Sequence, residues 1–281
     1  MRVSERLGLE FASNALDVDL LNKIFSTMLG KNIPYETVSN LALDVHIKSA
    51  TQMADAVVSG LGGHCVEHAV LLLAVLLEHG FDATYANGDV HDVLRNTCNP
   101  LAKAYVLVTI DGDTFACDPF YRRKSILLPR EGVIHYKKLV LQRLDKNTVR
   151  LQTVVNGDVT HEEVIRQNTT LDDRRNEFKR RYVAFSPFGI TAPYFQQMLP
   201  MRRALFYHPI SDRFVAHDNS SLMMIALDSL DECDWIPASI RSQILMFLPV
   251  ARRQRDAAIA FLKQGLYTPH YLQLETRATL G

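Results

Sequence analysis

The stretch GLGGHCVEHAVLLLAVLLEHG, from Gly60 to Gly80, joins a glycine pair, a cysteine and a long apolar run. The pair at 62–63 permits a sharp backbone turn that a Cβ atom would block. The apolar run predicts a buried helix over 66–79 that ends at Gly80, a residue typical of helix C-termini. Cys65 then lies in the first helical turn, where unpaired N–H groups and the helix dipole favour a thiolate over a thiol. Two interpretations stay open: a reactive nucleophile, or a small apolar residue in a core.

The bulk composition excludes several classes of protein. The chain has 281 residues, and its 31 Lys and Arg balance its 31 Asp and Glu, so no net charge favours nucleic acid or an anionic membrane as a partner. The segment MRVSERLGLEFAS lacks the apolar core of a signal peptide, and the longest apolar run, Ala69–Leu77, is too short to span a bilayer. The four cysteines match neither a disulfide framework nor zinc-binding spacing. We therefore expect a cytoplasmic protein with reduced thiols and no metal.

Periodicity predicts helices first and strands afterwards. Apolar residues at helical spacing predict helices over Leu16–Leu29 and Ser49–Val58, the second with Ser49 as its N-cap. Downstream, the turn signal DGD at 111–113 separates two predicted strands, Ala102–Ile110 and Thr114–Phe120. Three further strands are predicted at 138–144, 148–155 and 159–165. This succession is typical of a small antiparallel sheet or barrel.

The segments beyond these strands are more mixed. The stretch TLDDRRNEFKRR at 170–181 predicts a charged helix that serves as a solvated connector. The last third combines strand-like pieces with helices, among them one over Val250–Gln264 that stops at Gly265. The chain thus runs from helices through antiparallel strands to a mixed C-terminal part.

Three segments together resemble the arylamine N-acetyltransferases: IPYE at 33–36, GGHCVEH at 62–68 and ACDPF at 116–120. Members of that family carry similar pieces in the same order and at similar spacing. The resemblance implies an α+β fold with a cysteine-proteinase-like core. Its three parts would be an N-terminal helical bundle (1–82), a central antiparallel β-barrel (83–186) and a C-terminal α/β lid (187–281).

The resemblance also implies ping-pong acyl transfer. In this family a cysteine takes the acetyl group from acetyl-CoA as a thioester and passes it to an amine nitrogen, so no cofactor is permanently bound. A thiolate suits this task because it is the side-chain nucleophile most readily available at neutral pH. By position in the motifs, Cys65 matches the nucleophile and Asp118 matches the aspartate that orients the triad histidine.

The sequence departs from the family pattern at that histidine. Counting back fifteen residues from Asp118 gives Lys103, and no histidine occurs between His91 and His135. The arginine that precedes the family's glycine pair is replaced by Leu61. The central member of the triad is therefore absent from its expected place.

Several replacements for the histidine are open. His68 follows Cys65 by three residues and would share its helical face, so it is one candidate for a relocated base. His91, in the loop-like segment NGDVHDV, is another. Lys103 itself would stabilise a thiolate as a fixed cation paired with Asp118, although the same pair would also be an ordinary structural ion pair.

Two broader alternatives remain. The helix terminus and Lys103 would suffice without a strong base if the donor has a good thiol leaving group and the acceptor amine is basic. Alternatively, catalysis is lost and the fold survives as a ligand- or partner-binding module.

The sequence therefore predicts a cysteine-dependent N-acyltransferase that forms amides through a Cys65 thioester. Asp118, Lys103 and His68 are the other predicted site residues. The predicted donor is acetyl-CoA, another acyl-CoA or an acyl-carrier protein, and the predicted acceptor is a small-molecule amine.

Overall fold

The computed structural model describes residues 2–11, 15–30, 33, 35–36, 47–59, 62–92, 97–119, 124–176, 194–198, 202–208, 213–218, 221–225, 242 and 245. The chain divides into two compact units, one made of residues 1–33, 47–59 and 63–177 and the other of 34–46, 60–62 and 178–281. Every predicted site residue belongs to the first unit. The three-part division stays a prediction, and the helix expected over Val250–Gln264 lies outside the described residues.

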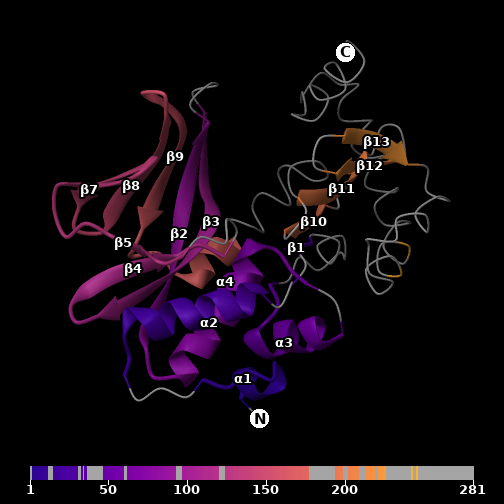
Figure 1. The fold of residues 1–281 in the computed structure, drawn as a ribbon, viewed down its shortest axis with the longest axis horizontal. Helices are drawn as coiled ribbons and strands as arrows, with labels where there is room; N and C mark the ends of the chain where they lie inside the picture. Colours follow the sequence, from indigo (N-terminus) through magenta and orange to yellow (C-terminus); the bar gives the residue numbers. More distant parts are fainter. Residues whose placement is uncertain are drawn as a thin grey trace. The chain divides into compact units, whose positions relative to one another are not determined.

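Helices form the N-terminal part of the first unit, as predicted: α1 (Val3–Arg6), α2 (Val18–Gly30), α3 (Ala50–Val58) and α4 (Cys65–Glu78) (Figure 1). On α2, Leu21 and Ile24 are fully buried, which confirms the predicted inner face. Ser49 caps α3, because its hydroxyl accepts the backbone N–H of Gln52. Leu16, expected on the inner face of α2, precedes that helix and is about half exposed.

An eight-stranded antiparallel sheet follows the helices and confirms the predicted α+β fold. The strand order is β5-β4-β3-β2-β9-β8-β7-β6, so β5 and β6 are the two edge strands of the sheet. Their bounds are β2 (Asp82–Asp92), β3 (Thr97–Ile110), β4 (Asp113–Cys117), β5 (Ile126–Leu127), β6 (Val133–Tyr136), β7 (Leu139–Asp145), β8 (Thr148–Val155) and β9 (Asp158–Arg166).

Turn chemistry explains why these hairpins form where the sequence predicts them. In the DGD turn between β3 and β4, Asp111 and Gly112 have φ values of +50° and +79°. Asn156 and Gly157, between β8 and β9, have +54° and +89°. Two successive positive φ values fit the twist of paired strands, and Asp-Gly and Asn-Gly pairs adopt them most readily.

A buried hydrophobic core lies against one face of the sheet. Tyr105, Leu107 and Ile165 are buried there with apolar residues from β2, β4, β7 and β8. Helix α4 packs against β2 and β3, which joins the helices to the sheet. Helix α4 ends just before Gly80, as predicted, and the φ of +87° at Gly80 is typical of a glycine that follows a helix.

A second antiparallel sheet belongs to the other unit. It contains β1 (Tyr35–Glu36), β10 (Tyr194–Met198), β11 (Arg202–His208), β12 (Arg213–Asp218) and β13 (Ser221–Ile225), paired in that order. Among the described residues, no helix has the length and apolar character that crossing a membrane requires.

Candidate active site

Cys65 is the first residue of α4 and is buried. The residue before it, His64, caps the helix: its Nδ1 accepts the N–H of Val66 at 3.2 Å. Burial lowers the pKa of His64 to about 4, the charge of Glu67 opposes this shift, and the cations of Arg174 and Lys48 reinforce it. The imidazole is therefore neutral at neutral pH, as its acceptor role requires. This arrangement fixes the start of the helix, where the helix dipole favours a negative charge on Cys65.

Glu67 ties the same helix end to α3. Its carboxylate accepts the N–H of His64 at 3.1 Å, the N–H of Lys48 at 3.0 Å and the Nζ of Lys48 at 3.2 Å. Burial alone would raise the pKa of Glu67, but the charge that His64 gains in the acidic range, the charge of Lys48 and these two backbone bonds hold it below its usual value. A Cβ atom on Gly63 would lie 2.4 Å from the Glu67 Oε2 atom, so this close approach requires glycine.

Lys103 and Asp118, predicted to be neighbours, form a buried ion pair. The Nζ of Lys103 lies 2.7 Å from Asp118 Oδ2, and the two residues are 4% and 5% exposed. Lys103 comes from the middle of β3, and Asp118 directly follows β4, the strand paired with β3. The hairpin thus brings together the residue in the expected histidine position and the aspartate.

A second carboxylate, which the sequence analysis did not single out, also binds Lys103. The Oε1 and Oε2 atoms of Glu163 lie 2.7 and 2.8 Å from the lysine Nζ, and Glu163 is 1% exposed. The Tyr105 hydroxyl donates to Glu163, and His161 Nε2 lies 2.5 Å from Glu163 Oε1. We call Lys103, Asp118, Glu163, Tyr105 and His161 the lysine cluster.

Strand register explains how Lys103 reaches Glu163. Strand β2 lies between β3 and β9, and Gly88 of β2 pairs with Lys103 on one side and with Ile165 on the other. Glu163 stands two residues before Ile165 and therefore on the same face of the sheet. Because Gly88 has no side chain, the lysine can extend across β2 to the glutamate. A Cβ at this position would lie 2.6 Å from Tyr105 Cε2.

The cluster places one ammonium between two carboxylates. Burial raises the pKa of Glu163, while the charge and hydrogen bonds of Lys103 lower it, and burial prevails. The two carboxylates together carry more charge than Lys103, so its field on other groups is weaker than that of an isolated cation. Lys103 would therefore stabilise a thiolate less than the fixed cation of the prediction.

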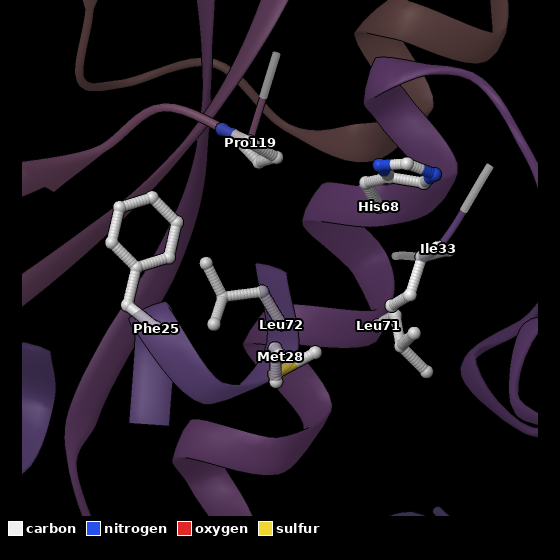
Figure 2. Close-up of a pocket in the computed structure, with 7 residues that line it drawn as sticks. All are labelled: Phe25, Met28, Ile33, His68, Leu71, Leu72 and Pro119. Atoms are coloured by element: carbon white, nitrogen blue, oxygen red, sulfur yellow. The ribbon is translucent and has the colours of Figure 1, made fainter. Parts of the chain in front are cut away.

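His68 lies one helical turn after Cys65 and lines a small apolar pocket. The pocket is bounded by α2, α4, Ile33 and Pro119, the residue after Asp118. Figure 2 shows the imidazole of His68 and the ring of Pro119 at one end of this pocket, with Phe25, Met28, Leu71 and Leu72 around the rest. The pocket therefore adjoins the aspartate through the backbone and the cysteine helix through His68.

His91, predicted in a loop, belongs to strand β2. Its Nε2 lies 3.7 Å from the Sγ of Cys98, the residue on β3 with which His91 is paired. Asp89 is close to both, but its carboxylate accepts the Leu101 N–H at 2.8 Å and Arg166 Nε at 2.7 Å. The structure thus pairs His91 with an exposed thiol at the end of the hairpin where the chain passes from β2 to β3.

The charged segment 170–181 is helical over 171–176 and mostly exposed there, as predicted, with Arg174 as the exception. Within its described part, residues 171–176, Arg174 is 7% exposed rather than solvated. Its guanidinium donates to the carbonyls of Leu101 and Ala102, which precede Lys103. The positive charge of Arg174 also contributes to the lowered pKa of His64. Burial raises the pKa of Tyr85; the charge of Arg174 opposes this shift, and the charge of Cys65 adds to it. Arg174 therefore adds positive charge near the end of α4 that carries the cysteine.

Comparisons with known proteins agree with this architecture. A family model described as N-acetyltransferase matches residues 17–173. The chain is similar to the arylamine N-acetyltransferase of Mycobacterium marinum, with a TM-score of 0.63 and 17% identity over 89% of this chain and 97% of that one. The enzyme of Salmonella typhimurium gives a TM-score of 0.61 and 14% identity over 88% and 96%.

A third similar structure has a modified triad. It is an arylamine N-acetyltransferase of Bacillus cereus described as having a unique Cys-His-Glu catalytic triad, with a TM-score of 0.57 and 15% identity over 79% and 90% of the two chains. At such identities, these likenesses show the fold alone. No curated protein matches the sequence significantly.

Proposed function

Because the chain belongs to the arylamine N-acetyltransferase family, we propose that it transfers an acyl group from a thioester to an amine through a covalent thioester on Cys65. The proposed donor is acetyl-CoA or another acyl-CoA, and the proposed acceptor is a small-molecule amine. A carrier-protein donor and a cytoplasmic location stay predictions from the sequence.

One observation supports this proposal above the others: the predicted nucleophile begins a buried helix, and the residue in the expected histidine position contacts the predicted aspartate. Cys65 begins a buried, doubly capped helix, and Lys103 contacts Asp118 across the β3–β4 hairpin. The position at the helix N-terminus and the nearby positive charge of Arg174 distinguish Cys65 from a cysteine buried only among apolar side chains. These features favour a thiolate at Cys65.

The proposed chemistry has two stages. The Cys65 thiolate attacks the donor's carbonyl carbon, and the carbon–sulfur bond to CoA breaks as CoA leaves. The amine nitrogen then attacks the Cys65 thioester, its carbon–sulfur bond breaks, and an amide is released as the amine loses a proton. In this proposal the ion pair of Asp118 and Lys103 lies beside the reacting groups and compensates the charge that develops on them.

The apolar pocket supports an apolar group on one of the substrates. Leu71, Leu72 and Phe25 offer no hydrogen bonds, whereas His68 and the segment of Pro119 lead toward the proposed site. The pocket has room for little more than one water molecule, so we propose that only a methyl-sized group, such as the methyl of an acetyl group, binds there, because burial of apolar surface favours such a group.

The alternative is a binding module without acyl transfer. The compensation of Lys103 by two carboxylates favours this reading, because the pair then resembles a structural ion cluster. The two functions differ in one property: only the enzyme forms a covalent acyl adduct.

The test is an intact-mass measurement after incubation with acetyl-CoA and longer acyl-CoA donors. We expect one acyl adduct in the wild-type protein and none in Cys65→Ser. Cys98→Ser is the matched control, because Cys98 is exposed and paired with His91 and could take up acyl groups nonspecifically. An adduct that survives Cys65→Ser but disappears in Cys98→Ser, or no adduct with any donor, contradicts the proposal.

A further inference from the structure

Acyl transfer needs a proton acceptor, and the residue in the expected histidine position cannot be one by itself. An ammonium group has no lone pair, so Lys103 accepts a proton only if it gives one up at the same time. Its Nζ is bonded to two carboxylates, and these are the groups to which that proton could pass.

The two carboxylates differ in their surroundings. Asp118 is buried beside Lys103 at the end of β4. Glu163 contacts Lys103 through both oxygens and also meets the imidazole of His161, whose side chain is 27% exposed. On the Glu163 side of the lysine cluster, a titratable group thus reaches from the buried carboxylate toward water.

We propose that Glu163, acting through Lys103, is the proton acceptor that replaces the triad histidine, and that His161 connects Glu163 to solvent. This inference rests on the proposed function, in which Lys103 lies beside Cys65. Glu163 is a relay residue that touches no substrate itself.

The proposed step balances in charge and protons. When the amine attacks the Cys65 thioester, an amine N–H bond breaks and its proton moves to Lys103 Nζ. An Nζ–H proton moves at the same time to Glu163, so Lys103 remains an ammonium and Glu163 becomes neutral. The thioester carbon–sulfur bond breaks, and Cys65 leaves as a thiolate. His161 then takes the proton from Glu163 and releases it to water.

The other groups around Glu163 suit this role. Lys103 and Tyr105 face it from β3 and His161 from β9, with Asp118 beyond the lysine. Burial raises the pKa of Glu163, which makes the carboxylate a better base at neutral pH than an exposed one. Donation from Tyr105 holds its orientation.

The test separates loading of Cys65 from the amine step. The wild-type protein and each variant are loaded with p-nitrophenyl acetate, freed of excess ester and mixed with aniline. Loss of the acetyl adduct is then followed by intact mass. Loading tests the proposed function, and the aniline step tests the relay.

Glu163→Gln is the decisive variant, and it retains the Lys103–Asp118 ion pair. We expect the aniline-dependent loss to be about a hundredfold slower, the usual scale for general base catalysis. In contrast, alkylation of Cys65 by iodoacetamide should be as fast or faster at each pH, because removing a nearby anion favours the thiolate. Glu162→Gln is the matched control: this neighbour points to Gln152 instead and should leave both rates unchanged.

His161→Asn gives an independent readout at a partly exposed position. We expect a slower aniline step that added imidazole restores, since a diffusing base can take the place of the side chain. An aniline step in Glu163→Gln that is as fast as in the wild type overturns the relay alone. If wild-type Cys65 cannot be loaded, the proposed function fails and the relay fails with it.

Discussion

At the scale of single residues, Gly88 is the position on which the lysine cluster depends most directly. Replacing glycine with alanine in a strand would ordinarily stabilise the protein slightly, by about 0.5–1 kcal/mol. Here the added Cβ would lie 2.6 Å from the ring of Tyr105, which is fully buried. We therefore expect Gly88→Ala to lower the free energy of unfolding by about 1–3 kcal/mol, the range for overpacking a core. Chemical denaturation measures it.

Tyr105→Leu provides the control for this steric explanation. In that background the ring is gone, so adding Gly88→Ala should cost less than it does in the wild type. An equal loss in both backgrounds would mean that the glycine is needed for another reason.

The residues of the candidate site differ in how far sequence could predict them. Motif order and spacing were enough to predict the Lys103–Asp118 contact, because a tight hairpin joins their strands. Glu163 stands 60 residues from Lys103, and their contact depends on the pairing of β2 with β9. The only sequence signal was that one of the two glutamates in the strand VTHEEVI must point inward. Without the register, alternation could not show whether Glu162 or Glu163 is that residue.

At the scale of elements, the start of α4 makes stability depend on pH. Burial lowers the pKa of His64 to about 4, whereas an unperturbed histidine has a pKa of 6.5. Between these values the unfolded chain binds a proton that the folded chain does not, so stability falls as the pH falls. From pH 7 to pH 5 this one group should remove about 2 kcal/mol.

His64→Asn should abolish that part of the pH dependence. Asparagine is a good N-cap and offers an oxygen to the helix N–H groups, but it does not titrate. Denaturation at pH 7 and pH 5 should show a difference between the two pH values that is about 2 kcal/mol smaller in the variant. His135→Asn, at an exposed position on β6, should leave the difference as in the wild type. Equal pH dependence in His64→Asn and wild type would contradict a neutral cap.

The elements that the sequence predicted are those with a local signal. Capping residues and apolar spacing identified α3 and α4, and Asp-Gly and Asn-Gly turns identified the hairpins. Strand β2 was missed around NGDVHDV because its residues are polar and turn-prone. Their partners are distant in sequence: Asn87 donates to the Thr170 carbonyl, and Asp89 accepts from Arg166. The same long-range contacts explain why Arg174 is buried.

At the scale of the whole molecule, three distant parts of the sheet meet at one buried charge. Lys103 belongs to β3, Asp118 follows β4, and Glu163 belongs to β9, which returns to β2 only after the β6–β8 meander. The antiparallel fold class was predictable from turns and alternation, but the pairing of β9 with β2, which brings Glu163 to Lys103, was not. A neutral overall composition also conceals the cluster, since its excess of negative charge is local.

Global stability can reveal whether that cluster serves the fold or the chemistry. Lys103→Met alone leaves two buried carboxylates without a cation and should lower the free energy of unfolding by about 3–5 kcal/mol. The triple variant Lys103→Met, Asp118→Asn, Glu163→Gln has no buried charge at these positions. We expect it to unfold within about 1 kcal/mol of the wild type or to be more stable, because replacing a complete buried ion cluster is often neutral or stabilising. Transfer of acetyl from Cys65 to aniline should nevertheless be lost. If the triple variant is as unstable as Lys103→Met, the cluster is retained for the fold, and its proposed role in acyl transfer loses its main support.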